Sequence, residues 1–208
     1  MILYDYPRST AAYRVRIALH YKKIKFEQKK IHLLQDGGQQ YLSEYTAINP
    51  QQLLPTLNDN GALITQSLAI IEYLDEQYPT PSILPKKPLA RAQVRSLAQM
   101  VACDIHPLNN LRVLNYLRDG FNANDSNVTT WYHHWLKKGF DAIEQRLSNF
   151  PRSKPVCYGD TITLADMCLI PQAYNAERFH FSLEKYPTIQ SIITYCLTLD
   201  AFMRAKPT

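Results

Sequence analysis

The chain has 208 residues, of which 46% are hydrophobic and 20% charged, and its net charge is +5. This is enough apolar material for one large domain or two modest ones without disulfides or metal. The modest charge is interleaved with apolar residues rather than gathered in a run, which disfavours nucleic-acid binding and fits an anionic small-molecule ligand.

No stretch approaches the roughly 20 apolar residues of a membrane span, and the start of the sequence lacks the apolar run of a secretory signal. We therefore expect a cytoplasmic protein that does not enter a membrane. The four cysteines form no Cys-x-x-Cys pair, and no histidine spacing completes a zinc site. We expect reduced, mostly buried thiols and no metal.

The first part of the chain alternates strand and helix signals. Residues 2–6 form a short β-branched and aromatic run that ends before a proline, which predicts a strand. Residues 11–23 carry apolar side chains at helical spacing with basic residues on the other side, which predicts an amphipathic helix. A second strand is expected over 26–34, and two glycines at 37–38 predict a break.

A short helix over 39–45 is expected next. Two brief strands over 54–57 and 62–64 follow, joined by Asn58-Asp59-Asn60-Gly61, which is a good hairpin turn. A third helix over 67–78 closes the region. The order β-α-β-α-β-β-α predicts two parallel strands followed by an antiparallel hairpin, which is the thioredoxin-like arrangement.

The remainder of the chain shows only helix signals. Residues 79–88 hold four of the thirteen prolines and are the expected linker. Apolar periodicity predicts one long helix over 94–108 and another over 131–147. Thr163-Leu164-Ala165-Asp166 resembles a capping box with Asp in place of Glu, so a buried helix is expected to start there. The predicted fold class is α+β, with a thioredoxin-like N-terminal domain and an all-α C-terminal domain.

The corner between the first strand and the first helix is the expected reactive site, because the free N–H groups of a helix start favour an anion. It reads Arg8-Ser9-Thr10-Ala11-Ala12-Tyr13-Arg14 and contains no cysteine, so we do not expect dithiol exchange. Ser9 and Thr10 instead place two hydroxyls where a thiolate brought by a ligand needs a hydrogen bond. A serine at this position also fits an ordinary N-cap.

Two further positions fit a bound peptide. Gln66-Ser67 opens the third predicted helix, where Ser67 and its N–H are suited to hold a carboxylate, although Ser67 also fits an N-cap. Pro55 stands directly before a strand and suits a cis peptide bond. The backbone of Leu54 before it is then free to pair with a peptide. These features together indicate a pocket for a small acidic peptide that carries a thiol.

Several blocks of the sequence resemble the zeta-class glutathione transferases. Residues 9–19 resemble the family signature Ser-Ser-Cys-Ser-x-Arg-Val-Arg-Ile-Ala-Leu. Further matching blocks follow in family order over nearly the whole chain, at residues 36–41, 49–57, 66–74, 107–111 and 175–179. Agreement in this many ordered blocks makes the resemblance specific. The main departure is Ala11, which stands where the family usually has cysteine.

The resemblance implies glutathione as the cofactor and a homodimer as the assembly. It implies a glutathione-binding domain at 1–80, a linker at 81–88 and an all-helical substrate-binding domain at 89–208. His106 also fits an ordinary buried histidine. The implied glutathione contacts are Ser9, Thr10, Ala11, Ala12, Tyr13, Arg14, Gln40, Leu54, Gln66, Ser67, His106, Asn110, Leu111 and Arg112.

The resemblance also implies a reaction, the cis-trans isomerisation of maleylacetoacetate to fumarylacetoacetate in tyrosine and phenylalanine breakdown. Reversible addition of a thiolate converts the double bond into a single bond that rotates. Ser9 is the expected catalytic hydroxyl, with Thr10 as a second donor. Arg8 and Arg178 are the expected partners of the small dicarboxylate substrate, because guanidinium groups are planar and permanently charged. Arg112 is a third candidate, and a solvated surface charge is the alternative for each.

Other functions stay open at this point. The same thiolate chemistry fits maleylpyruvate isomerisation, general glutathione transfer and dehalogenation of α-halo acids. A different class is a non-catalytic adaptor that kept the fold and lost the site, and Ala11 favours this alternative. Retention of Ser9, Gln66-Ser67 and Arg178 favours an enzyme.

Overall fold

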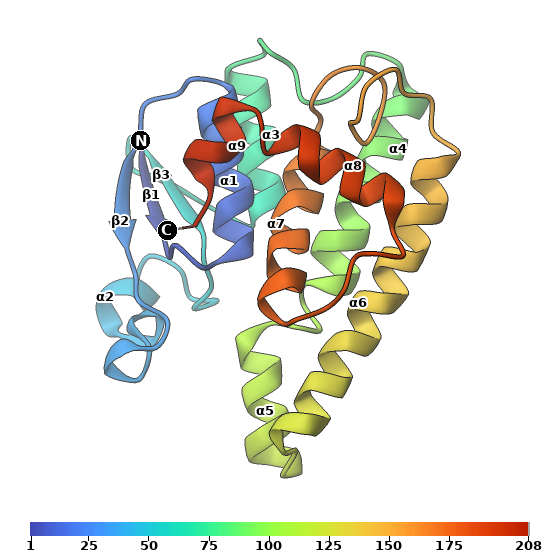
Figure 1. The fold of residues 1–208 in the computed structure, drawn as a ribbon. Coiled ribbons are helices and arrows are strands. Elements are labelled where there is room, and N and C mark those ends of the chain that lie inside the picture. Colours follow the sequence, from blue (N-terminus) through green and yellow to red (C-terminus); the bar gives the residue numbers. More distant parts are fainter. Residues whose placement is uncertain (208) are drawn as a thin grey trace. The chain divides into compact units, whose positions relative to one another are not determined.

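The structure, a computed structural model, describes residues 1–207 of the chain (Figure 1). It divides into two compact units, and each is described by itself. The first contains Met1–Ser82 and the stretch from Leu197 to the end of the described chain, and the second contains Ile83–Cys196. The expected domain range 89–208 differs from this division at its C-terminal end, and residue 208 lies outside the described residues. The domain ranges therefore stay a prediction.

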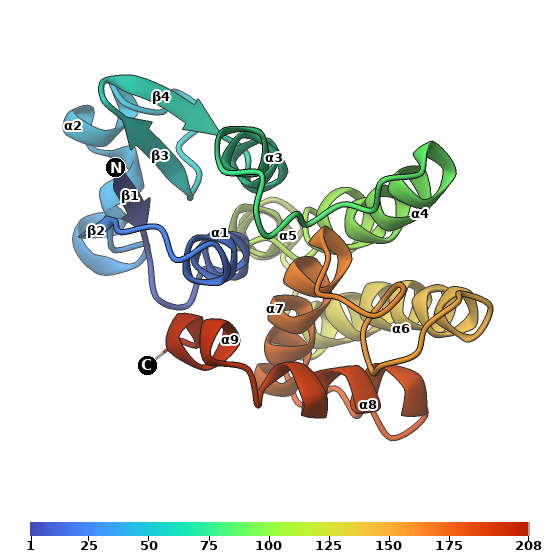
Figure 2. The ribbon, with the colours of Figure 1, turned by 90° about the horizontal axis from the view of Figure 1, so that it is seen from above.

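The first unit is built on a four-stranded sheet with the strand order β2-β1-β3-β4. β1 is parallel to β2, and β3 is antiparallel to both of its neighbours. The strands are β1 (Ile2–Asp5), β2 (Glu27–Lys30), β3 (Thr56–Asp59) and β4 (Ala62–Thr65). Helices α1 (Thr10–Tyr21) and α3 (Ser67–Gln77) cover one face of the sheet, and α2 (Ser43–Thr46) lies on the other (Figure 2).

The predicted element order and the predicted cis bond between Leu54 and Pro55 are confirmed, and a second cis bond precedes Pro81. The strand expected over 26–34 is shorter, because β2 has only the four residues of β1 as partners. The helix expected over 39–45 is interrupted at Leu42, whose backbone is extended. Two short segments replace it, a 3-10 turn η2 (Gln39–Tyr41) and α2.

The basic side of α1 is buried rather than solvated, so this part of the amphipathic prediction is wrong. Arg14 and Arg16 are only 1% and 4% exposed. Helix α9 (Asp200–Ala205) packs on α1 within the first unit and contacts Arg16, whereas Arg14 is hydrogen-bonded to Ser67 on α3. Arg16 Nε donates to the carbonyl of Ala205 at 2.9 Å. Periodicity within α1 carries no information about a helix that arrives from the far end of the chain.

The second unit contains only helices among its described elements. They are α4 (Pro88–Gln99), a π-helical segment η3 (Met100–Ile105), α5 (Leu111–Phe121), α6 (Asp125–Ser148), α7 (Leu164–Arg178) and α8 (Pro187–Cys196). The helix expected over 94–108 therefore starts earlier and changes its hydrogen-bond pattern near its end. The helix expected over 131–147 also begins earlier, at a capping box formed by Asn124 and Asn127.

The predicted capping box of α7 is confirmed. Asp166 accepts hydrogen bonds from the backbone N–H and the hydroxyl of Thr163, both at 2.8 Å, and from the N–H of Cys157 at 2.7 Å. All three residues are buried. The four cysteines are free, and all but Cys103 are buried, as predicted. Over residues 1–207, none of the helices has both the length and the apolar character to cross a membrane.

Candidate active site

The predicted site residues of the first unit meet at one edge of the sheet. Tyr4, Thr56 and Thr65 lie side by side on β1, β3 and β4. Because β3 runs antiparallel to both neighbours, the chain leaves β1, enters β3 and leaves β4 at the same edge. The loop to Ser9, the bend at Leu54 and the turn at Gln66 therefore emerge together.

Ser9 caps the start of α1. Its backbone is extended, and its hydroxyl oxygen accepts a hydrogen bond from the N–H of Ala12 at 3.2 Å. A hydroxyl has one donor and two acceptor sites, so this bond leaves the Ser9 hydrogen available for a ligand. Thr10, the first helical residue, is buried, and the N–H of Ala11 has no acceptor within residues 1–207. The helix start thus presents a hydroxyl and a backbone donor at its positive end.

Side-chain hydrogen bonds fix the backbone before β3. The carbonyl of Leu53 accepts hydrogen bonds from the Tyr45 hydroxyl at 2.6 Å and from Asn49 Nδ2 at 2.8 Å. Burial raises the pKa of Tyr45, so this hydroxyl stays a donor. No hydrogen bond to the N–H or carbonyl of Leu54 is present in the described part of the chain. Leu54 is therefore an extended position whose backbone groups are open to a peptide.

The start of α3 is strained and tied to α1. Gln66 has φ 69° and ψ 116°, a rare conformation for a residue with a side chain, and strain of this kind gathers at binding sites. Its side-chain amide donates to Gln51 Oε1 at 2.9 Å. Ser67 is the first helical residue rather than the N-cap, and its hydroxyl accepts from Arg14 Nη1 at 3.2 Å. The buried Arg14 thus places positive charge next to the helix start.

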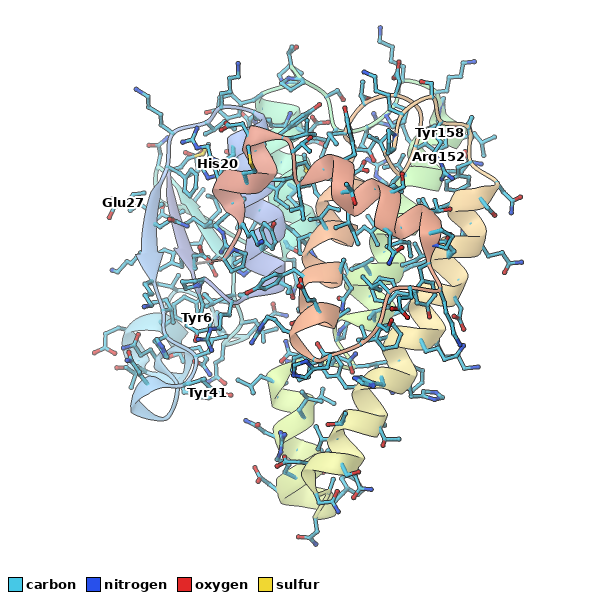
Figure 3. All side chains as sticks on the ribbon, viewed as in Figure 1. Tyr6, His20, Glu27, Tyr41, Arg152 and Tyr158 are labelled. Carbon is cyan, nitrogen blue, oxygen red and sulfur yellow. The ribbon has the colours of Figure 1, made fainter. Side chains whose placement is uncertain are left out.

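Gln40 lies on η2, beside Tyr41. Figure 3 places Tyr41 toward the same end of the first unit as Tyr6, which follows β1. The ring of Tyr6 packs edge-on against His32 at 4.9 Å, and the N–H of His32 donates to Gln39 Oε1 at 2.8 Å. Gln40 is buried, and its Oε1 has no hydrogen-bond partner within residues 1–207. Arg8, in the loop before Ser9, is exposed.

The predicted site residues of the second unit gather around one turn of α6. The carbonyl of Leu108 accepts from Trp131 Nε1 at 2.8 Å, and Asn109 Nδ2 donates to the carbonyl of Tyr132 at 3.3 Å. These bonds fix the segment between His106 and α5, where Asn110 caps the helix by accepting from the N–H of Arg112 at 3.1 Å.

His133 ties the same turn of α6 to the end of α7 through a hydrogen bond of 2.7 Å between its Nε2 and the carbonyl of Phe179. His106 is half-buried, so the alternative of an ordinary buried histidine fits it only in part. Leu111 is also half-buried, and Arg112 and Arg178 are exposed.

Sequence reasoning did not single out several residues that shape these regions. Gln51 holds Gln66, Arg16 reaches the loop before Ser9, and Tyr132 and Asn175 lie next to Arg178. Gln51, Arg16 and Asn175 fall inside the blocks that match the family, and this was the one available signal. Tyr132 lies outside these blocks and bonds to Asn175, which is far away in the sequence, so no local pattern reveals it.

The chain is similar to known proteins over nearly the full length of both. Residues 3–82 match the family model described as glutathione S-transferase, N-terminal domain. The probable maleylacetoacetate isomerase of Vibrio cholerae is 46% identical, with 100% of this chain and 95% of that protein covered.

Two solved structures are also similar over the full length. A maleylpyruvate isomerase, described as a bacterial zeta-class glutathione S-transferase, is 45% identical with a TM-score of 0.95 and covers 100% of this chain and 97% of its own. A maleylacetoacetate isomerase of Methylobacterium extorquens with bound malonate and glutathione is 39% identical with a TM-score of 0.95, covering 100% and 96%.

Proposed function

The chain belongs to the zeta class of the glutathione transferases, and from this we propose that it catalyses the glutathione-dependent isomerisation of maleylacetoacetate to fumarylacetoacetate. One observation carries the proposal. The hydroxyl of Ser9, the backbone of Leu54 and the start of α3 emerge at the same edge of one sheet. Three relatives of full length that bear the name maleylacetoacetate isomerase, at 42 to 46% identity, support the choice of reaction.

The first unit fits a tripeptide with two acidic ends and a thiol. The backbone of Leu54 is suited to pair with the peptide, and the N–H groups at the start of α3, next to Arg14, are suited to a carboxylate. Ser9 and Thr10 are suited to the sulfur. We propose that the further contacts expected from the family, including Gln40 and the His106 to Arg112 segment, complete glutathione binding.

Bound glutathione supplies a thiolate that adds to the double bond and leaves again after rotation. The protein must favour the anion over the thiol, and each tenfold gain in thiolate requires about 1.4 kcal/mol. A hydroxyl donor and a helix start together supply about 1 to 3 kcal/mol. Ser9 donates the hydrogen bond, and Thr10 is the second donor. Ala11 contributes its N–H, so the missing family cysteine leaves this role intact.

We further propose that Arg8 and Arg178 receive the two carboxylates of the substrate, with Arg112 as a third candidate. Their exposed guanidinium groups carry a permanent charge and a planar set of donors that matches a carboxylate. A cytoplasmic homodimer is part of the proposal. Exposed apolar side chains, among them Tyr41 at 51% and Leu89 at 72%, are consistent with a partner surface, and a mass measurement in solution tests it.

The test is a panel of maleylacetoacetate, maleylpyruvate and dichloroacetate, each with and without glutathione. We expect glutathione-dependent turnover with maleylacetoacetate as the preferred substrate. Preference for maleylpyruvate favours the second candidate, which a relative of 45% identity supports. Absence of turnover and failure to bind a glutathione column would revive the adaptor alternative.

A double variant tests whether turnover of all three substrates depends on the same glutathione thiolate. Ser9→Ala with Thr10→Ala is expected to lower all turnover in parallel. Ser191→Ala with Thr194→Ala, which removes two exposed hydroxyls from α8, is the matched control and is expected to leave turnover unchanged.

A further inference from the structure

Arg178 is exposed but held in place. It is the last residue of α7, and its Nη1 donates to Asn175 Oδ1 at 3.3 Å. The guanidinium carbon lies 5.8 Å from the ring centre of Tyr174 and 6.0 Å from that of Phe179. An exposed arginine ordinarily loses rotamer freedom when it binds a ligand. These contacts restrict the side chain in advance, while the remaining N–H groups stay available to a carboxylate.

Asn175 uses both ends of its side chain. It is buried at 9% exposure, accepts from Arg178 through Oδ1 and donates through Nδ2 to the hydroxyl of Tyr132. A guanidinium has donors only, so Oδ1 must face Arg178 and Nδ2 must face Tyr132. The Tyr132 hydroxyl accepts from Nδ2 and thereby holds the amide group in the position in which its Oδ1 meets Arg178.

Tyr132 anchors this chain of hydrogen bonds on α6. It is fully buried, and its ring stacks on Phe179 with centres 3.8 Å apart and planes 11° apart. Burial raises the pKa of Tyr132, so the hydroxyl stays neutral. The backbone of Tyr132 accepts from Asn109, and the adjacent His133 bonds to the carbonyl of Phe179. One turn of α6 thus holds both the end of α7 and the segment before α5.

We infer that Tyr132 and Asn175 are positioning residues that hold the Arg178 guanidinium in the orientation that receives a substrate carboxylate. The inference rests on the proposed function only in assigning a dicarboxylate to Arg178. Burying the amide of Asn175 and the phenol of Tyr132 costs free energy. Apolar side chains would replace them easily if they served packing alone. Their arrangement is explained by what it does to Arg178.

The test compares Tyr132→Phe in two backgrounds, the full-length wild type and Arg178→Ala. The substitution removes the hydroxyl and keeps the ring on Phe179. Malonate, a simple dicarboxylate, is the probe, and its dissociation constant is measured by calorimetry with glutathione present. We expect Tyr132→Phe to weaken malonate binding about fivefold in the wild type, the size of one lost neutral hydrogen bond, and not at all in Arg178→Ala. The affinity for glutathione should not change.

Tyr186→Phe is the matched control, because this tyrosine also bonds to α6, through Asp141 at 2.9 Å, and belongs to a different cluster of rings. It should leave malonate binding unchanged. A second variant, Asn175→Asp, places a competing carboxylate against Arg178 and should weaken malonate binding more than tenfold. This variant tests the inference if Tyr132→Phe does not fold.

Equal weakening in both backgrounds, or no weakening in the wild type, would overturn the inference. Malonate binding requires no turnover, so the result is independent of the isomerase assay. A wild type that binds malonate through Arg178 but does not isomerise maleylacetoacetate contradicts the proposed function and leaves the positioning role standing.

Discussion

Ser9 combines a structural and a chemical role in one hydroxyl. As an acceptor it caps α1 through the N–H of Ala12, and as a donor it is free to bond to a sulfur anion. The two interpretations that the sequence left open, an ordinary cap and a thiolate donor, therefore do not exclude each other. Ser67 is different, because its hydroxyl accepts from Arg14 and the cap position belongs to Gln66.

A single residue, His20, makes the stability of the first unit depend on pH. Burial, followed by the positive charge of Arg204, lowers its pKa. The folded protein therefore binds this proton less tightly than the unfolded chain does. The contribution of His20 to stability is complete above the ordinary histidine pKa of about 6.5 and is lost as the pH falls below it toward the lowered value.

We expect His20→Gln to flatten the decline of the free energy of unfolding between about pH 7 and 5, measured by denaturant titration. The matched control is His134→Gln on α6, which should keep the slope of the wild type. An unchanged slope in His20→Gln would contradict the assignment.

At the scale of elements, the buried start of α7 depends on Asp166. Its carboxylate accepts three hydrogen bonds, from Thr163 N–H, the Thr163 hydroxyl and Cys157 N–H. Asp166→Ala leaves three buried donors without their acceptor. We expect the free energy of unfolding to fall by about 3 kcal/mol or more.

The control for Asp166 is Asp125→Ala, which removes an exposed first-turn aspartate from α6 and should cost less than about 1 kcal/mol. Chemical denaturation measures both. Equal effects of the two variants would show that the buried hydrogen bonds of Asp166 do not matter.

Arg16 connects the C-terminal helix to the loop that carries Ser9. Its Nη1 bonds to both oxygens of Asp5 at 2.7 and 2.8 Å, its Nη2 to the carbonyl of Pro7 at 2.9 Å, and its Nε to the carbonyl of Ala205 at 2.9 Å. A lysine has a single nitrogen at its end and does not reach all of these acceptors in this geometry.

Arg16→Lys should therefore loosen the loop and weaken glutathione binding about tenfold, as measured by calorimetry, because a misplaced donor loses most of its hydrogen-bond energy. Arg204→Lys, on the exposed side of α9, is the control and should bind glutathione like the wild type. An unchanged affinity for glutathione in Arg16→Lys would show that the contact of Arg16 with α9 does not affect the site.

The elements were predictable where the signal is local. The presence of the hairpin, the α7 capping box and the order of strands and helices follow from residues close in sequence. The bounds of the hairpin were predicted less well, because Asn58 and Asp59 were assigned to the turn but pair with β4 as part of β3. The length of β2 was not predictable, because it depends on strand register. The burial of Arg14 and Arg16 was not predictable either, because Arg14 bonds to Ser67 on α3 and Arg16 bonds to Ala205 on α9, both far away in the sequence.

At the scale of the whole molecule, the candidate residues divide between the two units. The hydroxyls of Ser9 and Thr10, the backbone of Leu54 and the start of α3 belong to the first, and Arg178 with its supports belongs to the second. The sequence was sufficient to predict the fold class. The first group stays a prediction, which the sequence suggested because the corner before the first helix carries a recognisable pattern. The sequence was not sufficient to predict the supports of Arg178, which depend on side-chain contacts of Tyr132 on α6 with Asn175 and Phe179.

The central claim is that the first unit stabilises the thiolate of bound glutathione. The direct measurement is the ultraviolet absorbance of the thiolate of bound glutathione as a function of pH, in the wild type and in the Ser9→Ala, Thr10→Ala double variant. We predict that the wild type carries at least about tenfold more thiolate at neutral pH than the double variant, which corresponds to about 1.4 kcal/mol. Equal thiolate fractions in two proteins that both bind glutathione would contradict the account.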